Sequence, residues 1–167
     1  VATEEVKHIA IETYRIAAEH AATGWDDFAS SQLSFRYLMA LALKFRAIRF
    51  QYFEESVRRD PSIAALASLM EISAPAEIDR LYPRLRPARV TVTTARGKFT
   101  RQADEALGSR LVPFDDDGLK GKFLELVAPV HGESKAKPLM AQVWDIETCP
   151  DVRPLIDKPP PIEPQPG

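Results

Sequence analysis

A tyrosine on an otherwise apolar helix is the residue in this sequence best suited to carry chemistry. The segment SSQLSFRYLMALALKFRAIRF, residues 30–50, has the hydrophobic period of a helix over residues 32–48. At 100° per residue, its apolar side chains cover an arc of roughly 200°, which is typical of a helix that packs on more than one side. Tyr37 lies at the edge of the remaining strip, whose members are Ser34, Arg36, Tyr37, Ala40 and Lys44.

The position of Tyr37 has two interpretations. A tyrosine at a polar edge can be a core ring that keeps its hydroxyl in water. Alternatively, the phenol donates or relays a proton. A group with an ordinary pKa of about 10 does this only when its neighbours lower the pKa or the step is undemanding. The residues alone leave both interpretations open.

Other catalytic and metal-binding patterns do not occur in the sequence. It contains no glycine-rich phosphate loop, no paired cysteines and no H-E-x-x-H motif. The three histidines are scattered without the spacing of metal ligands. The acidic run at residues 115–117 is interpreted as a helix cap rather than a cation site. We therefore expect neither a metal nor a cofactor.

The bulk composition describes a soluble globular chain. Of its 167 residues 45% are hydrophobic and 28% are charged, and the net charge of -2 argues against nucleic-acid or polybasic membrane binding. No apolar run reaches the roughly 18 residues that span a bilayer. The opening VATEEVKHIAIE lacks the apolar segment of a signal peptide, and a single cysteine suits a reducing compartment. A cytoplasmic protein is expected.

The patterns along the chain predict an α+β fold, with a small antiparallel sheet packed against about five helices. An opening strand is expected around Ile9 and Ile11, and a β-hairpin over residues 88–103. Residues 15–30 fit a helix at their start and a loop at their end. Helices are expected over residues 32–48, 51–58, 62–70, 119–127 and 134–147. The folded domain is expected over residues 1–150, followed by an extended proline-rich tail over residues 151–167.

The order of these segments resembles the second, C-terminal domain of the MmgE/PrpD family. That family includes 2-methylcitrate dehydratase, cis-aconitate decarboxylase and iminodisuccinate epimerase. VKHIAIETY resembles its opening strand, and QLSFRYLMALAL resembles its Q-x-S-x-x-Y-x-x-A-x-A-L helix. PARVTVTTARGKFT is similar to its hairpin, and GLKGKFLELVAP to its K-F-x-x-L helix. The resemblance covers about Val6 to Ile146.

The sequence departs from the family pattern in three respects. The family usually has a glycine after the A-x-A-L helix, where this chain reads LKFRAIRF. Its G-x-P-x-x-P loop is replaced by GSRLVPFDDDG, which keeps Gly108 and Pro113. Family members are also much longer, because a large helical N-terminal domain supplies most of their acid/base residues.

The resemblance implies a cofactor-free active site in a cleft between two domains. The implied chemistry forms a carbanion beside a carboxylate of a small substrate, with water, carbon dioxide or a proton lost or regained. By position it implies that Tyr37 is catalytic. Arg36 and Lys44 are candidates to hold substrate carboxylates, although a solvated face is the alternative for both. Gln32 and Ser34 match the same helix motif, either as substrate-binding residues or as residues that pack behind the site and support it.

We therefore expect the small subunit or second domain of a lyase, hydratase or epimerase that acts on a small carboxylate. It would be inactive without a larger helical chain carrying the main acid/base residues, in a heteromer or a dimer of heterodimers. The alternative is a non-catalytic binding or assembly module that retains the fold. A buried Tyr37 bonded to its own backbone would favour the alternative, and an open cleft lined by Tyr37 and cations would favour the enzyme.

Overall fold

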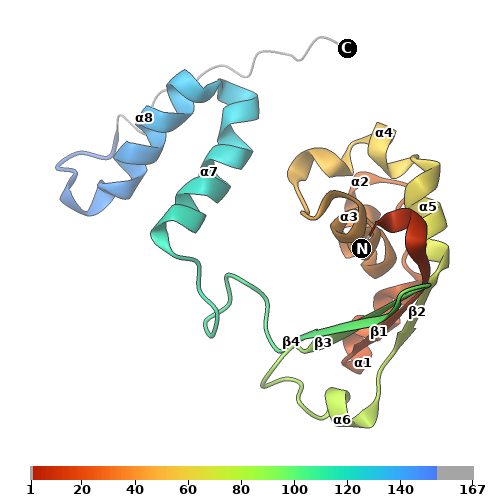
Figure 1. Ribbon diagram of the computed structural model, residues 1–167. Helices are drawn as coiled ribbons and strands as arrows, with labels where there is room; N and C mark the ends of the chain where they lie inside the picture. Colours follow the sequence, from red (N-terminus) through yellow and green to blue (C-terminus); the bar gives the residue numbers. More distant parts are fainter. Residues whose placement is uncertain (1, 154–167) are drawn as a thin grey trace. The chain divides into compact units, whose positions relative to one another are not determined.

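The computed structural model describes residues 2–153, which form two compact units, residues 2–112 and residues 113–153 (Figure 1). The first unit holds all but one of the buried side chains found in the described part of the chain; the exception is Ala136. Whether both units belong to one domain over residues 1–150 stays a prediction. The tail expected over residues 151–167 lies almost entirely outside the described residues.

A four-stranded mixed sheet organises the first unit, with strand order β2-β1-β3-β4. β1 pairs parallel with β2 and antiparallel with β3, and β3 and β4 form an antiparallel hairpin. In chain order the elements of this unit are η1 (Thr3–Glu5), β1 (Val6–Thr13), α1 (Arg15–Glu19), η2 (His20–Ala22), α2 (Phe28–Leu33), α3 (Phe35–Phe45), η3 (Phe50–Phe53), α4 (Glu55–Arg58), α5 (Pro61–Ser68), β2 (Met70–Ser73), α6 (Ala76–Asp79), β3 (Ala88–Thr94) and β4 (Gly97–Ala103).

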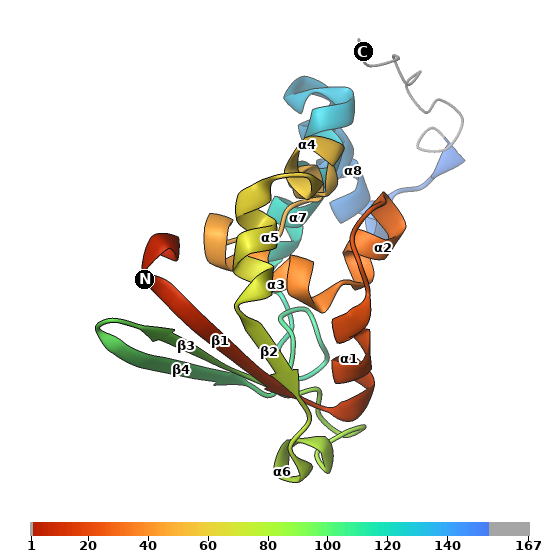
Figure 2. The same ribbon diagram turned by 90° about the vertical axis from the view of Figure 1, so that its right-hand side faces the viewer.

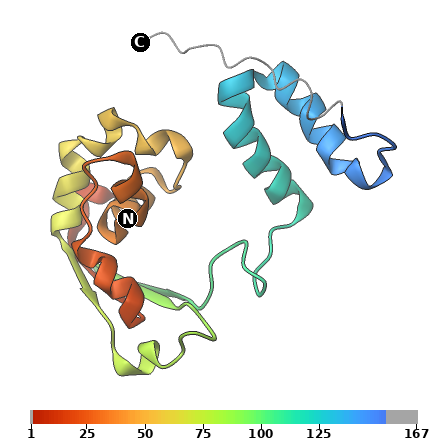
Figure 3. The same cartoon turned by 180° about the vertical axis from the view of Figure 1, so that it is seen from behind.

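The core of the first unit lies where α3 and α5 pack together against one face of the sheet (Figure 2). Strand alternation sends Ile9 and Ile11 of β1 into this core, whereas Glu12 faces the other way. There Glu12 forms a bidentate ion pair with Arg89, its cross-strand partner on β3, at 2.6 and 2.8 Å. α1 runs beside β1 and β2, as the view from behind shows (Figure 3).

Polar residues fix where the helices begin. The Asp27 carboxylate and the Ser30 hydroxyl form a reciprocal capping box at the start of α2. Asp60 accepts a hydrogen bond from the Ser62 amide, and Pro61 takes the first turn of α5, as predicted. Ser34 ends α2 and caps α3, so the single helix expected over residues 32–48 is wrong. Two helices meet at Ser34, because its extended backbone breaks the hydrogen-bond ladder.

Several predicted elements are confirmed, and one strand was not foreseen. The α+β class, the opening strand, the hairpin and the helix after Asp60 all agree with the structure. β2, which pairs parallel with β1, makes the sheet mixed rather than antiparallel. Residues 15–30 carry more helix than expected, and the helix predicted over residues 51–58 is a 3-10 turn followed by α4.

The second unit is a pair of adjacent helices, α7 (Asp116–His131) and α8 (Glu133–Trp144), followed by η4 (Ile146–Thr148). Both helices were predicted. Asp115 caps α7 by accepting a hydrogen bond from the Gly118 amide at 2.8 Å. Gly132 links the helices with a φ of 77°, a left-handed value that glycine adopts without strain.

Within residues 2–153, no helix combines the length and the hydropathy needed to cross a membrane.

Candidate functional site

Tyr37, in the first turn of α3, is completely buried. Its hydroxyl donates a hydrogen bond to the backbone carbonyl of Tyr52, at the end of η3. The ring stacks on Trp25, with 5.9 Å between centroids, and lies at a tilt beside Phe53 at 6.1 Å. The interpretation of Tyr37 as a core ring with its hydroxyl in water is wrong in its second part, because rings from two other segments cover the side chain and the hydroxyl bonds a carbonyl.

Burial governs the acidity of this phenol. Removal from water raises the pKa of Tyr37 above its ordinary value; Arg58 opposes the rise and the negative charge of Asp60 adds to it. The hydroxyl therefore remains protonated at neutral pH and acts as a hydrogen-bond donor. Its catalytic role stays a prediction, and this role requires the hydroxyl to exchange the Tyr52 carbonyl for a substrate oxygen.

Arg36 and Ser34 are engaged in holding the domain together. The Arg36 guanidinium donates hydrogen bonds to three backbone carbonyls, those of Ala21 at 3.1 Å, Ala67 at 3.0 Å and Met70 at 2.6 Å. Ser34 is buried, and its hydroxyl donates to the Thr23 carbonyl at 2.8 Å while accepting from the Tyr37 amide. Both side chains join segments that are distant in sequence, so their local environment differs from a solvated helix face.

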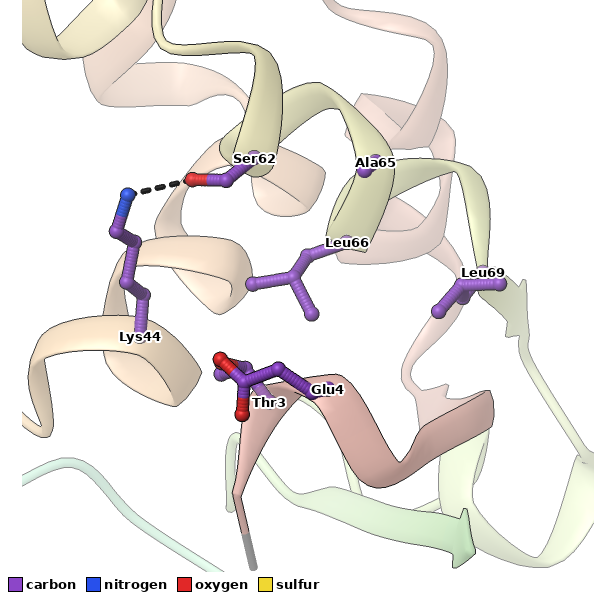
Figure 4. A pocket seen from close by; sticks show the side chains of 7 residues that line it. All are labelled: Thr3, Glu4, Lys44, Ser62, Ala65, Leu66 and Leu69. Atoms are coloured by element: carbon purple, nitrogen blue, oxygen red, sulfur yellow. Dashed lines mark hydrogen bonds between the residues drawn. The ribbon is translucent and has the colours of Figure 1, made fainter.

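Lys44, near the end of α3, lines a surface pocket of about 310 Å³ (Figure 4). The apolar part of the pocket comes from α5 and from Leu69, which follows it, and the polar rim includes Lys44, Ser62 and Glu4. The Lys44 ammonium donates hydrogen bonds to the Asp60 carboxylate and to the Ser62 hydroxyl. Two carboxylates, those of Asp60 and Glu4, therefore lie at or beside this pocket.

Asp60 responds strongly to this environment. Hydrogen bonds from Lys44 and then from Ser62 lower its pKa from the ordinary value of 3.8 to about 2. The Asp60 carboxyl group is therefore ionised at neutral pH, and its carboxylate lies against the Lys44 ammonium. A substrate carboxylate would have to compete with Asp60 for the ammonium, so anion binding by Lys44 stays a prediction.

The five candidate side chains do not converge on one pocket. Ser34 and Tyr37 meet at the start of α3, but none of the other four candidates lines the pocket at Lys44. Gln32 is exposed at the end of α2. Sequence patterns did not identify Trp25 and Phe53, which enclose Tyr37, because aromatic residues in loops and short helices have no period that predicts a neighbour.

No group of three or more histidine, cysteine, aspartate or glutamate side chains capable of holding a metal occurs in residues 2–153.

A comparison with protein families gives a match over most of the chain. The family model described as MmgE/PrpD C-terminal domain matches residues 1–146. Among curated proteins, no sequence matches the chain significantly. The matched range includes the whole first unit and the α7–α8 pair of the second.

Proposed function

The chain belongs to the MmgE/PrpD family, and from this premise we propose that it completes the active site of a cofactor-free lyase, hydratase or epimerase. The substrate would be a small carboxylate. A separate helical chain or domain would supply the main acid/base residues, in a heteromer or a dimer of heterodimers in the cytoplasm. Tyr37 would be the catalytic group that this chain contributes.

The observation that carries this proposal is the family match over residues 1–146, to a domain that is C-terminal by description. The bonding of the candidate residues supports the need for a partner. Arg36, Lys44 and Tyr37 are each bonded to groups of their own domain, so carbanion chemistry requires a base from elsewhere.

An exposed pair of aromatic rings gives such a partner a place to pack. Phe28 and Phe50 are 44% and 60% exposed, and their ring centroids lie 5.6 Å apart. Phe28 also contacts Phe53 at 6.1 Å, and Phe53 contacts the Tyr37 ring. A helical chain that packs on Phe28 and Phe50 would press on η3, whose Tyr52 carbonyl holds the Tyr37 hydroxyl. Partner binding would thereby release the phenol toward the substrate.

The burial of Tyr37 favours a second candidate, a non-catalytic binding or assembly module that retains the family fold. A phenol that is fully buried and bonded to a backbone carbonyl already has a structural role. In this alternative, Tyr37 holds η3 against α3 and takes no part in a reaction.

The experiment that separates the two begins with purification of the natively expressed protein and determination of its intact mass. A larger helical chain at a fixed ratio, or a longer polypeptide that contains this domain, supports the first proposal. The assembly is then tested on a panel of hydroxylated di- and tricarboxylates, by the ultraviolet absorbance of a conjugated alkene carboxylate. Tyr37→Phe should lower kcat by about a hundredfold, the range of general acid/base catalysis.

Tyr52→Phe is the matched control. It removes a hydroxyl from the neighbouring ring and leaves the backbone carbonyl that accepts from Tyr37 in place. Its kcat should remain within about twofold of the unsubstituted enzyme, since no reacting group is lost. Equal kcat values for the two variants, with Tyr37→Phe merely less stable, would assign the chain to the non-catalytic module.

A further inference from the structure

A second pocket, with a volume of about 240 Å³, lies between the end of α3 and the β3–β4 hairpin. Two arginines, Arg46 and Arg101, line it together with apolar residues, which are Ala42, Leu43, Val90, Val92 and Phe99. The described residues that line it include no carboxylate. The Lys44 pocket differs in this respect, because two carboxylates lie at or beside that cavity.

The sheet register places the hairpin residues on one face. Phe99 and Arg101 are two residues apart on β4, so both point toward α3. Val92 lies opposite Phe99, and Val90 lies opposite Arg101. The hairpin thus presents three apolar side chains and one guanidinium group together.

Arg46 reaches this pocket from an unusual backbone conformation. It ends α3 with a φ of 58° and a ψ of 18°, the left-handed region in which glycine is the favoured residue. Among residues 2–153 it is the one non-glycine residue with a positive φ. This conformation costs free energy for a residue that has a side chain, which favours a role for the Arg46 side chain.

We propose that this pocket binds a carboxylate that carries an apolar body, such as a short aliphatic or aromatic acid. The two guanidinium groups hold the carboxylate by charge-assisted hydrogen bonds, and the valines, Leu43 and Phe99 contact the body. Arginine has five N–H donors, so each guanidinium can bond the ligand while keeping bonds to the protein. This site uses none of the residues proposed to complete the family active site, so each proposal can fail without the other.

Titration with 3-phenylpropionate, followed by ¹H–¹⁵N NMR of the full chain, tests the proposal. Saturable shifts are expected at Val90, Val92 and Phe99. The uncharged amide of the same acid should bind about tenfold more weakly, because it loses the charge-assisted bonds. Equal affinity for acid and amide, or no saturable shift at the pocket, would overturn the proposal.

Variants that remove a positive charge test whether 3-phenylpropionate binds at this pocket. Arg101→Gln should weaken binding of 3-phenylpropionate by about tenfold. Lys98→Gln, the control, removes a positive charge from the opposite face of the same strand and should leave the affinity unchanged. An equal loss of affinity in both variants would mean that the acid is attracted nonspecifically to positive charge, and this would refute the proposed site.

Arg46→Gly provides a variant that is expected to fold, since glycine relaxes the left-handed backbone. Its affinity for 3-phenylpropionate should decrease about tenfold, and a circular dichroism spectrum like that of the unsubstituted protein would show that the variant is folded. Unchanged affinity in both Arg46→Gly and Arg101→Gln would show that the guanidinium groups bind no carboxylate.

Discussion

The Lys44–Asp60 ion pair makes the stability of this domain depend on pH. The pKa of Asp60 is about 2 in the folded chain, below its ordinary value of 3.8. A lowered carboxyl pKa contributes stability that is fully present above pH 3.8 and is lost as the pH falls through 2. Because both side chains are about 30% exposed, solvent screening reduces this contribution to about 1 kcal/mol.

Removal of Lys44 should therefore weaken the dependence of the free energy of unfolding on pH in the acidic range. In Lys44→Met, the free energy of unfolding should be about 1 kcal/mol lower than in the unsubstituted protein at pH 6, and the difference should shrink toward pH 2. Urea unfolding at a series of pH values measures this. Arg59→Met, which breaks the more exposed Arg59–Glu55 pair, is the control and should change little at any pH. If the difference in the free energy of unfolding between Lys44→Met and the unsubstituted protein stayed constant with pH, the pH dependence would not come from this ion pair.

At the scale of elements, Arg36 connects three segments that no strand ladder joins. Its guanidinium donates hydrogen bonds to the middle residue of the 3-10 turn η2, to the last turn of α5 and to the first residue of β2. Without it, three carbonyls lose a charged donor. Arg36→Met keeps most of the aliphatic stem and should lower the free energy of unfolding by about 2–3 kcal/mol.

Chemical denaturation of the variant measures this loss. Arg84→Met is a suitable control, since Arg84 is exposed, and it should change stability by no more than about 0.5 kcal/mol. Unchanged stability in Arg36→Met, combined with weaker substrate binding in an assembled enzyme, would instead support the substrate-holding role expected from the sequence.

The elements that the sequence predicts well are those specified by local patterns. The hairpin has alternating strands around a tight turn, and α5 begins with Asp60 and Pro61, so neighbouring residues suffice in both cases. β2 was missed because its four residues directly follow a helix and become a strand only by pairing with distant β1. The environment of Tyr37 was missed for the same reason: its covering groups, Trp25 and residues 52–53, lie on other segments.

At the scale of the whole molecule, the two units differ in how much side-chain surface they bury. The large hydrophobic core cluster lies entirely within residues 2–112. In residues 113–153 only Ala136 is buried, and large apolar side chains of α7 and α8, including Leu126, Val130 and Trp144, are 40% or more exposed. A helix pair of about 40 residues with so little burial is not expected to fold alone.

A fragment of residues 1–112 should therefore fold by itself. It contains all four strands, both core helices and every member of the core cluster, so its free energy of unfolding should match that of the full chain within about 1 kcal/mol. Urea unfolding measures this value, and ¹H–¹⁵N NMR checks that resonances of Ile9 and Leu41 keep their positions. A fragment of residues 1–87 is the control and should be unfolded, because it lacks β3 and with it Val92 and the antiparallel partner of β1. An unfolded 1–112 fragment would mean that the helix pair stabilises the sheet unit, which is the behaviour of one domain over residues 1–150.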